Sequence, residues 1–140
     1  MNNQFPDKTK HELVGTTQTL GLDYNVAALI CYLPVPMFSL IAGIVWLMTE
    51  PKANLFVRFH AIQSLMLLGV LVVGNVAVYI VGLLSAIPVL GGIFAIISGL
   101  AWFGICAVWF IVSVVLMLKA NQREMYKLPI IGDLAEQYAK

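Results

Sequence analysis

The chain has 140 residues, of which 61% are hydrophobic and 11% are charged, and its net charge is +1. A soluble domain carries about 25% charged residues, because a small protein must cover most of its surface with polar groups. The composition therefore argues against a soluble enzyme, and the small net charge argues against a nucleic-acid-binding surface. We predict an all-α, polytopic helical membrane protein whose main partner is the lipid bilayer.

Residues 1–22 are polar, mixed in charge and without helical periodicity. Such a segment cannot bury enough apolar surface to fold alone, so we predict a flexible amino-terminal arm. It lacks the apolar core of a signal peptide, and we expect the first apolar segment to remain in the mature protein.

The first charge-free segment covers residues 24–49, between Asp23 and Glu50. A bilayer core of about 30 Å needs about 20 apolar residues in a helix. We therefore predict one membrane span here, with Asp23 as its N-cap and Pro51 as its stop signal.

The second charge-free segment covers residues 59–118 and has room for two spans. Pro88 and the adjacent pair Gly91 and Gly92 are turn signals. We predict spans at residues 59–84 and 91–118, which gives about three transmembrane helices within a domain at 23–118, with four as the alternative count.

Basic residues set the expected orientation in the cell membrane. Lys52 and Arg58 lie in the first loop, the second loop has no charge, and the tail carries Lys119, Arg123 and Lys127. Because cytoplasmic loops are enriched in Lys and Arg, we predict a cytoplasmic first loop and C-terminus. Three spans then place the amino terminus outside, and a fourth would move it inside.

The tail at residues 119–140 has an amphipathic pattern. Asp133 and Glu136 have the spacing of a helix N-terminal cap, and Leu134 and Tyr138 then share one helix face. We predict a short helix that lies against the membrane surface or the first loop.

Small residues at helical spacing predict where the spans pack together, because helices in lipid associate through close contacts. Packing within one chain is the expected outcome, with a homo-oligomer as the alternative. The three predicted seams are Gly91, Ala95 and Gly99; Gly74 and Gly82; and Ser39 and Gly43.

Two polar features lie within the predicted spans. Pro34 and Pro36 free the carbonyls of Ile30 and Tyr32 from their helical partners, which predicts either a packing kink or a water-lined break. Asn75 predicts either an interhelical hydrogen bond or part of a polar path.

Residues typical of catalysis are sparse. No Asp or Glu lies within a predicted span, and neither nucleophile, phosphate-binding nor metal-ligand motifs are present. We predict no catalytic residue, no metal and no cofactor. Cys31 and Cys106 are predicted to be free, and His60 to be an interfacial histidine bonded to the backbone.

Three segments resemble a known family. Residues 25–34 read NVAALICYLP, residues 54–64 read NLFVRFHAIQS, and residues 126–136 read YKLPIIGDLAE. These segments, which include Gln63, are similar to those of small prokaryotic membrane proteins grouped with the Tic import-channel component of the chloroplast inner envelope. The resemblance implies a helical membrane protein of largely unassigned function, and the chloroplast relative implies a protein-conducting complex with four spans.

These observations favour a non-enzymatic scaffold or subunit of a membrane complex. We hypothesise that Arg58 pairs with Asp133 or Glu136, which would hold the tail against the bundle, and that this cytoplasmic face binds a membrane-protein partner. A pore or translocation subunit lined by Asn75 is the first alternative, and a lipid-acting enzyme that uses Arg58 and His60 is the second.

Overall fold

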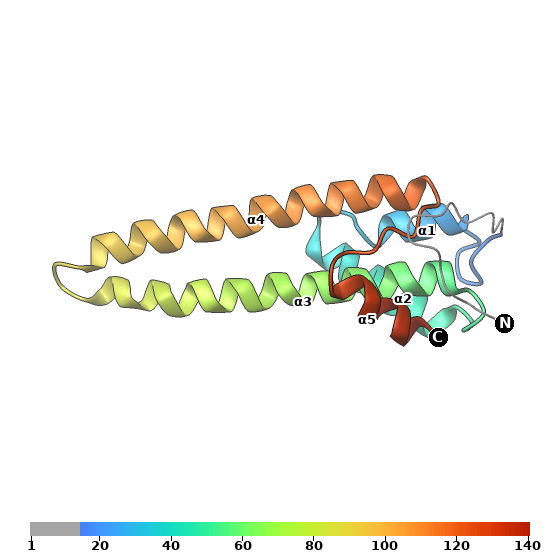
Figure 1. The fold of residues 1–140 in the computed structure, drawn as a ribbon, viewed down its shortest axis with the longest axis horizontal. Coiled ribbons are helices and arrows are strands. Elements are labelled where there is room, and N and C mark those ends of the chain that lie inside the picture. Colours follow the sequence, from blue (N-terminus) through green and yellow to red (C-terminus); the bar gives the residue numbers. More distant parts are fainter. Residues whose placement is uncertain (1–14) are drawn as a thin grey trace. The chain divides into compact units, whose positions relative to one another are not determined.

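The computed structural model describes residues 15–140, and Figure 1 shows that this part of the chain is helical. Within it, the β-type pairing is limited to one isolated bridge between Thr16 and Asp23. The all-α fold class is confirmed. The helices in chain order are α1 (Tyr24–Ile30), α2 (Pro36–Thr49), α3 (Leu55–Leu83), the 3₁₀ turn η1 (Leu84–Ala86), α4 (Gly91–Asn121) and α5 (Ile131–Ala139).

Two of these segments are long and apolar enough to cross a membrane, Leu55–Ala86 and Gly91–Asn121. Only 6% and 11% of their most apolar stretches are buried, whereas the core helix of a soluble protein is mostly buried. The predicted helices at 59–84 and 91–118 are therefore present, and the first of them begins earlier, at Leu55.

The predicted single helix over residues 24–49 is wrong, because the chain breaks between α1 and α2. Pro34 cannot donate a helical hydrogen bond, and Pro36 takes the first position of α2, where no N–H is needed. With 14 residues, α2 is about 21 Å long at about 1.5 Å per residue, short of a bilayer core of about 30 Å.

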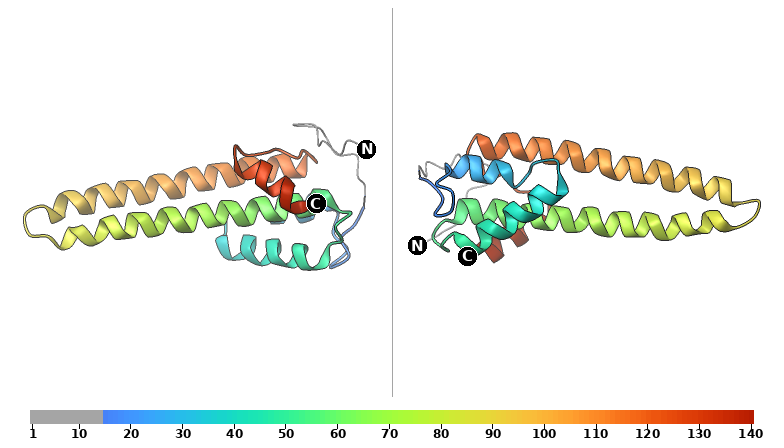
Figure 2. Two further views of the ribbon diagram at one scale, coloured as in Figure 1. Left: turned by 60° about the horizontal axis from the view of Figure 1, so that its bottom comes forward. Right: turned by 180° about the vertical axis from the view of Figure 1, so that it is seen from behind.

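The described part of the chain divides into two compact units, residues 15–68 with 113–140, and residues 69–112. The second unit is a helical hairpin, in which its parts of α3 and α4 run side by side (Figures 1 and 2). The predicted seam at Gly74 and Gly82 is confirmed: a Cβ at these positions would lie 3.4 Å from Ile105 and 3.6 Å from Ser98.

The predicted seam on α4 is wrong within this hairpin. Ala95 and Gly99 are exposed, and a Cβ on Gly99 would meet nothing within 4 Å. The reason is the rotation of α4, which turns Ser98 and Ile105 toward α3 instead. Gly91 serves the turn, since a Cβ there would lie 2.0 Å from the carbonyl oxygen of Ser85.

In the first unit, α2 packs through its small residues, and the predicted seam at Ser39 and Gly43 is confirmed. Both are buried, and a Cβ on Gly43 would lie 2.8 Å from the side chain of Leu65. Trp46 lies one turn further along the same buried face, and its indole Nε1 donates to the carbonyl of Ala27, 3.1 Å away. This bond joins α2 to α1.

Residues 15–22, predicted as the end of a flexible arm, form a turn. The Thr17 amide donates to the Leu22 carbonyl at 2.8 Å, and the Gln18 amide donates to Glu50 Oε1 at 2.9 Å. Asp23 is the N-cap residue of α1 as predicted, but its side chain makes no capping bond. The rest of the predicted arm, residues 1–14, lies outside the described part of the chain.

Candidate functional site

The break between α1 and α2 is a packed turn. The Leu33 amide donates to the Ile30 carbonyl at 3.3 Å, and the Ser39 hydroxyl donates to the Leu33 carbonyl at 2.7 Å. The predicted free carbonyl of Ile30 therefore has a partner inside the turn. This geometry favours the packing kink over the water-lined break, and it turns the Tyr32 side chain into the protein, where it is 1% exposed.

Tyr32 lies at the centre of a buried polar cluster with two residues of α3, which we call the core triad: Tyr32, His60 and Gln63. The Tyr32 hydroxyl is 3.0 Å from His60 Nδ1 and accepts a hydrogen bond from Gln63 Nε2 at 3.1 Å. His60 and Gln63 are both fully buried. The hydrogen-bond partner of His60 Nδ1 is a side chain rather than the predicted backbone group, because the break in the first apolar segment brings the Tyr32 hydroxyl beside it.

Aromatic rings enclose His60 on several sides. The ring centroids of Phe56, Phe59 and Tyr32 lie 4.7, 5.2 and 5.5 Å from that of His60, all with edge-to-face geometry. Such pairs add stabilisation beyond the area they bury. The imidazole is therefore part of the packed core and has no exposed surface.

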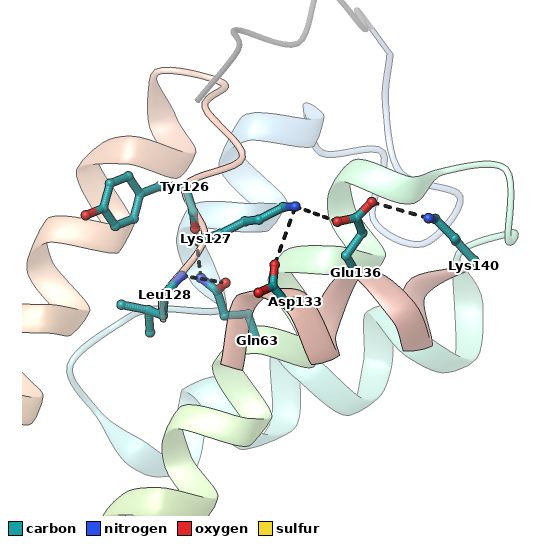
Figure 3. A network of polar contacts seen from close by, with 7 residues as sticks. All are labelled: Gln63, Tyr126, Lys127, Leu128, Asp133, Glu136 and Lys140. Atoms are coloured by element: carbon teal, nitrogen blue, oxygen red, sulfur yellow. Dashed lines mark hydrogen bonds and ion pairs between the residues drawn. The ribbon is translucent and has the colours of Figure 1, made fainter. Parts of the chain in front are cut away.

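Gln63 also holds the segment that links α4 to α5. Its Nε2 donates to the Tyr126 carbonyl at 3.1 Å, and its Oε1 accepts from the Leu128 amide at 3.4 Å (Figure 3). One side-chain amide thus satisfies a backbone donor and a backbone acceptor of a segment without regular structure, as buried backbone groups require. Gln63 joins the break, α3 and the tail.

Arg58 also anchors the tail, but with different partners from those predicted. Its guanidinium donates to the carbonyls of Leu47 at 3.1 Å, Glu50 at 3.2 Å and Ala139 at 3.3 Å. The predicted pairing of Arg58 with Asp133 or Glu136 is wrong, because the helix ends nearby offer carbonyls that no backbone amide satisfies. The expected result, a tail held against the first loop, is nevertheless what the structure shows.

The acidic residues of α5 pair with lysines instead (Figure 3). Lys127 contacts both Glu136 and, at 3.7 Å, Asp133, and Lys140 lies 3.3 Å from Glu136. Burial raises the pKa of the Glu136 carboxyl, but the hydrogen bonds and charges of Lys127 and Lys140 outweigh this and hold the pKa below its ordinary value of 4.5. Asp133 lies in the first turn of α5 and makes no capping bond, so its predicted capping role is wrong.

The outer face of α5 remains exposed while its inner face is buried. Gly132, Ala135 and Ala139 form the buried side. On the other side Leu134 and Tyr138 are 41% and 64% exposed, and Ile130, the N-cap residue that precedes the helix, is 78% exposed. These three residues recur every fourth position, and we call them the outer ridge.

Asn75 lies in the second unit and makes a local bond. Its Nδ2 donates to the Leu71 carbonyl at 2.8 Å, one turn earlier in α3. The predicted interhelical bond is wrong, because the backbone of its own helix offers the nearer acceptor. This bond also uses the side-chain amide of Asn75 that the predicted polar path would need.

The sequence of this chain matches a family described as the magnetosome magnetite crystal formation protein family, over residues 23–135. The chain belongs to this family. It is also 37% identical over 122 residues to a UPF0132 membrane protein of Methanocaldococcus jannaschii, which covers 87% of this chain and 94% of the relative. A UPF0132 membrane protein of Archaeoglobus fulgidus is 39% identical over 113 residues, covering 81% and 92%. No solved structure matches the chain.

These relatives confirm the coarser part of the predicted resemblance. This member of the magnetosome magnetite crystal formation protein family is similar to small archaeal proteins named only as membrane proteins, and its two long apolar helices are consistent with those names. Neither the family description nor these names mention the Tic channel, so they give that part of the resemblance no support.

Sequence reasoning missed several residues that hold the site of this family member together. Glu50 was seen only as a helix boundary, yet its carboxylate is buried and accepts from Asn54 at 2.7 Å. The side-chain contacts of Tyr32 and Lys127 were not predicted either. A phenol beside two prolines in an apolar segment is the one local signal, since a buried tyrosine hydroxyl needs a partner.

The arrangement holds segments together that lie far apart in the sequence. In this family member the described residues bring no three His, Cys, Asp or Glu side chains together as a metal site. Both cysteines are free, as predicted. Gln63 and Arg58 donate to backbone carbonyls of other segments, and His60 lies beside the Tyr32 hydroxyl. The outer ridge is the part of the tail that faces away from these side chains.

Proposed function

We propose that this family member is a non-enzymatic membrane scaffold that docks a protein partner on the outer ridge of α5. The observation that carries the proposal is that α5 is bound to the rest of the protein at both ends while its outer side chains stay exposed. Gln63 and Arg58 bind backbone groups on either side of α5, at Leu128 and Ala139, so the helix is held in place at both ends. Three apolar side chains then remain exposed on a fixed support.

The backbone at Ile130 supports a binding role for the ridge. Ile130 has a φ of 68°, a conformation that is strained for a β-branched residue, and its side chain is 78% exposed. Strained residues persist where the surrounding structure holds them, and they gather at binding sites. A glycine or asparagine would relieve the strain but would remove the apolar group.

The chemistry of the ridge favours a protein over the membrane surface. The carboxylate of Asp133 is 81% exposed beside Leu134, and an anionic leaflet would repel it. Apolar side chains every fourth residue next to an acidic group suit a helix that lies in an apolar groove with a basic rim. We therefore infer that the partner is a protein with such a groove.

The cytoplasmic side is part of the same proposal. Basic residues flank the site in the first loop and in the tail, and short loops rich in Lys and Arg stay in the cytoplasm. The chain would then be a multi-pass protein of the cell membrane with a cytoplasmic C-terminus. The family description attaches magnetite crystal formation to its members; for this chain we propose the platform role alone.

A photo-reactive phenylalanine analogue in place of Tyr138 tests the docking role. Tyr79 on α3 is the matched control, because the two tyrosines are 64% and 69% exposed. In intact cells we expect one discrete protein adduct from position 138 and none from position 79.

Binding measurements with the identified partner complete the test. Replacing Leu134 and Tyr138 together by serine is expected to weaken affinity by about 10- to 100-fold, since apolar anchors dominate such interfaces. If position 138 gives no adduct, or if the doubly substituted protein binds the partner unchanged, the docking role is wrong.

A further inference from the structure

The two ends of the segment 24–49 lie close together, and we call this the open end of the hairpin that α1 and α2 form. The Gln18 amide, before α1, donates to the carboxylate of Glu50, after α2, over 2.9 Å. A membrane-spanning segment would separate its two flanking residues by about 30 Å. Figure 2 shows α1 and α2 within the first unit, with their open ends beside the loop that precedes α3.

Two further bonds place α1 beside α2 and beside the end of α4. Trp46, three residues before the end of α2, donates to the carbonyl of Ala27, three residues after the start of α1. Asn25 Nδ2 donates to Asn121 Oδ1 at 3.4 Å, which places the start of α1 beside the end of α4. The open end of the hairpin therefore lies at the level of the charged loop and tail.

The outward face of α2 is apolar along its whole length. Met37, Ile41, Ile44 and Met48 repeat at helical spacing on this face and are 65%, 53%, 44% and 81% exposed. Charged residues occur only at the open end, because residues 24–49 contain none. A contiguous apolar face of this kind marks an interaction site.

The turn at the tip of the hairpin is compatible with membrane depth. Irregular backbone is tolerated in lipid only where its polar groups have partners in the protein. Here the amides of Tyr32, Leu33 and Val35 donate to carbonyls within the turn, and the Tyr32 hydroxyl points into the core triad. The exposed side chains at the tip, residues 35–38, are all apolar.

We propose that the α2 face (Met37, Ile41, Ile44 and Met48) binds the acyl chains of the membrane and that residues 24–49 form a re-entrant hairpin. At about 21 Å, α2 reaches past one leaflet of about 15 Å but does not cross the bilayer. Two spans remain, α3 and α4. Residues 15–23 and the tail then lie on the same side, which replaces the earlier expectation of an external amino terminus.

Side-specific labelling with a membrane-impermeant maleimide tests the topology. Single cysteines replace the exposed residues Gln18, Lys52, Ser85 and Gln137 in a chain that carries Cys106→Ser, and this chain is the blank because its remaining cysteine, Cys31, is buried. In intact cells we expect labelling of position 85 alone, with positions 18, 52 and 137 labelled only after permeabilisation. Position 18 labelled together with position 85 would show that residues 24–49 cross the membrane and would overturn the proposal.

Spin labels in proteoliposomes test whether lipid or protein covers the α2 face. At positions 37, 41, 44 and 48, collision with oxygen should be highest at 37 and fall steadily toward 48, with Val72 of α3 as the lipid-facing control. A spanning helix would show its maximum in the middle. Low collision rates at all four positions would show that a protein or a second copy covers this face, and would overturn the lipid assignment.

Discussion

The two units of the chain use polar side chains in opposite ways. In the first unit, Tyr32, His60 and Gln63 are buried and bonded to segments far away in the sequence. In the second unit, Asn75 and Ser98 bond to carbonyls one turn away in their own helices. A local bond satisfies a polar group without choosing a partner segment, whereas a long-range bond selects one arrangement over others.

The difference teaches how a chain with so few charged residues can still have a specific fold. Between two apolar helices, close contacts at residues such as Gly74 are enough to form a hairpin. Irregular segments need more, because every buried backbone group must have a partner. The three motif segments supply those partners, and all three meet in the first unit.

The largest expected effect comes from removing the amide that joins the segments. Gln63→Leu should lower the free energy of unfolding by about 2–4 kcal/mol, because it leaves the Tyr126 carbonyl and the Leu128 amide without this partner. Asn75→Leu is the matched control and should change it by no more than about 0.5 kcal/mol, since its bond is local. Denaturation with sodium dodecyl sulfate in mixed micelles measures both, and equal losses would contradict the comparison.

A smaller effect is expected at the turn of the second unit. Gly91→Ala should lower the free energy of unfolding by about 1–3 kcal/mol, because the added Cβ would lie 2.0 Å from the Ser85 carbonyl oxygen. Gly92→Ala, its neighbour, meets nothing within 4 Å and should be neutral or stabilising by about 0.5 kcal/mol. The same denaturation assay distinguishes the two, and a tolerated Gly91→Ala would show that the turn adapts.

The smallest effect concerns the tail and depends on pH. Because the pKa of Glu136 lies below its ordinary value of 4.5, its ion pairs stabilise the docked tail above that pH and are lost as the pH falls through the lower, folded value. Glu136→Gln should weaken docking by about 1 kcal/mol at neutral pH. A spin label at position 137 reports docking through its mobility.

The control for the tail is Asp133→Asn, whose side chain is 81% exposed and which should leave the mobility of that label almost unchanged. In the parent protein, mobility should rise as the solution is acidified, and in the Glu136→Gln protein it should be high at neutral pH and respond less. A label that stays immobile in the Glu136→Gln protein would show that Gln63 and Arg58 hold the tail without the ion pairs.

Local pattern was sufficient for some elements and misleading for others. The charge-free stretch 59–118 predicted two long helices and their turn, and both are present. The stretch 24–49 is equally free of charged residues but folds as two helices, because two prolines two residues apart break it. Hydrophobicity alone did not distinguish a span from a hairpin.

The candidate site divides in the same way. Arg58, His60 and Gln63 were identified from their motif, yet their partners were not, since carbonyls such as that of Ala139 carry no signal in the side-chain sequence. Opposite charges suggested an Arg58–Glu136 pair, but Lys127 lies closer to that carboxylate. Charge pattern cannot rank such alternatives until the distances are known.

The amino-acid sequence by itself determined that this protein is helical and belongs in a membrane, because transfer to lipid depends on the local supply of apolar and charged groups. Only the tertiary structure decided that the first apolar segment folds back on itself and that Gln63 and Arg58 hold the tail. Those outcomes depend on which distant groups meet, and hydrogen bonds at about 3 Å are set by the packed arrangement rather than by composition.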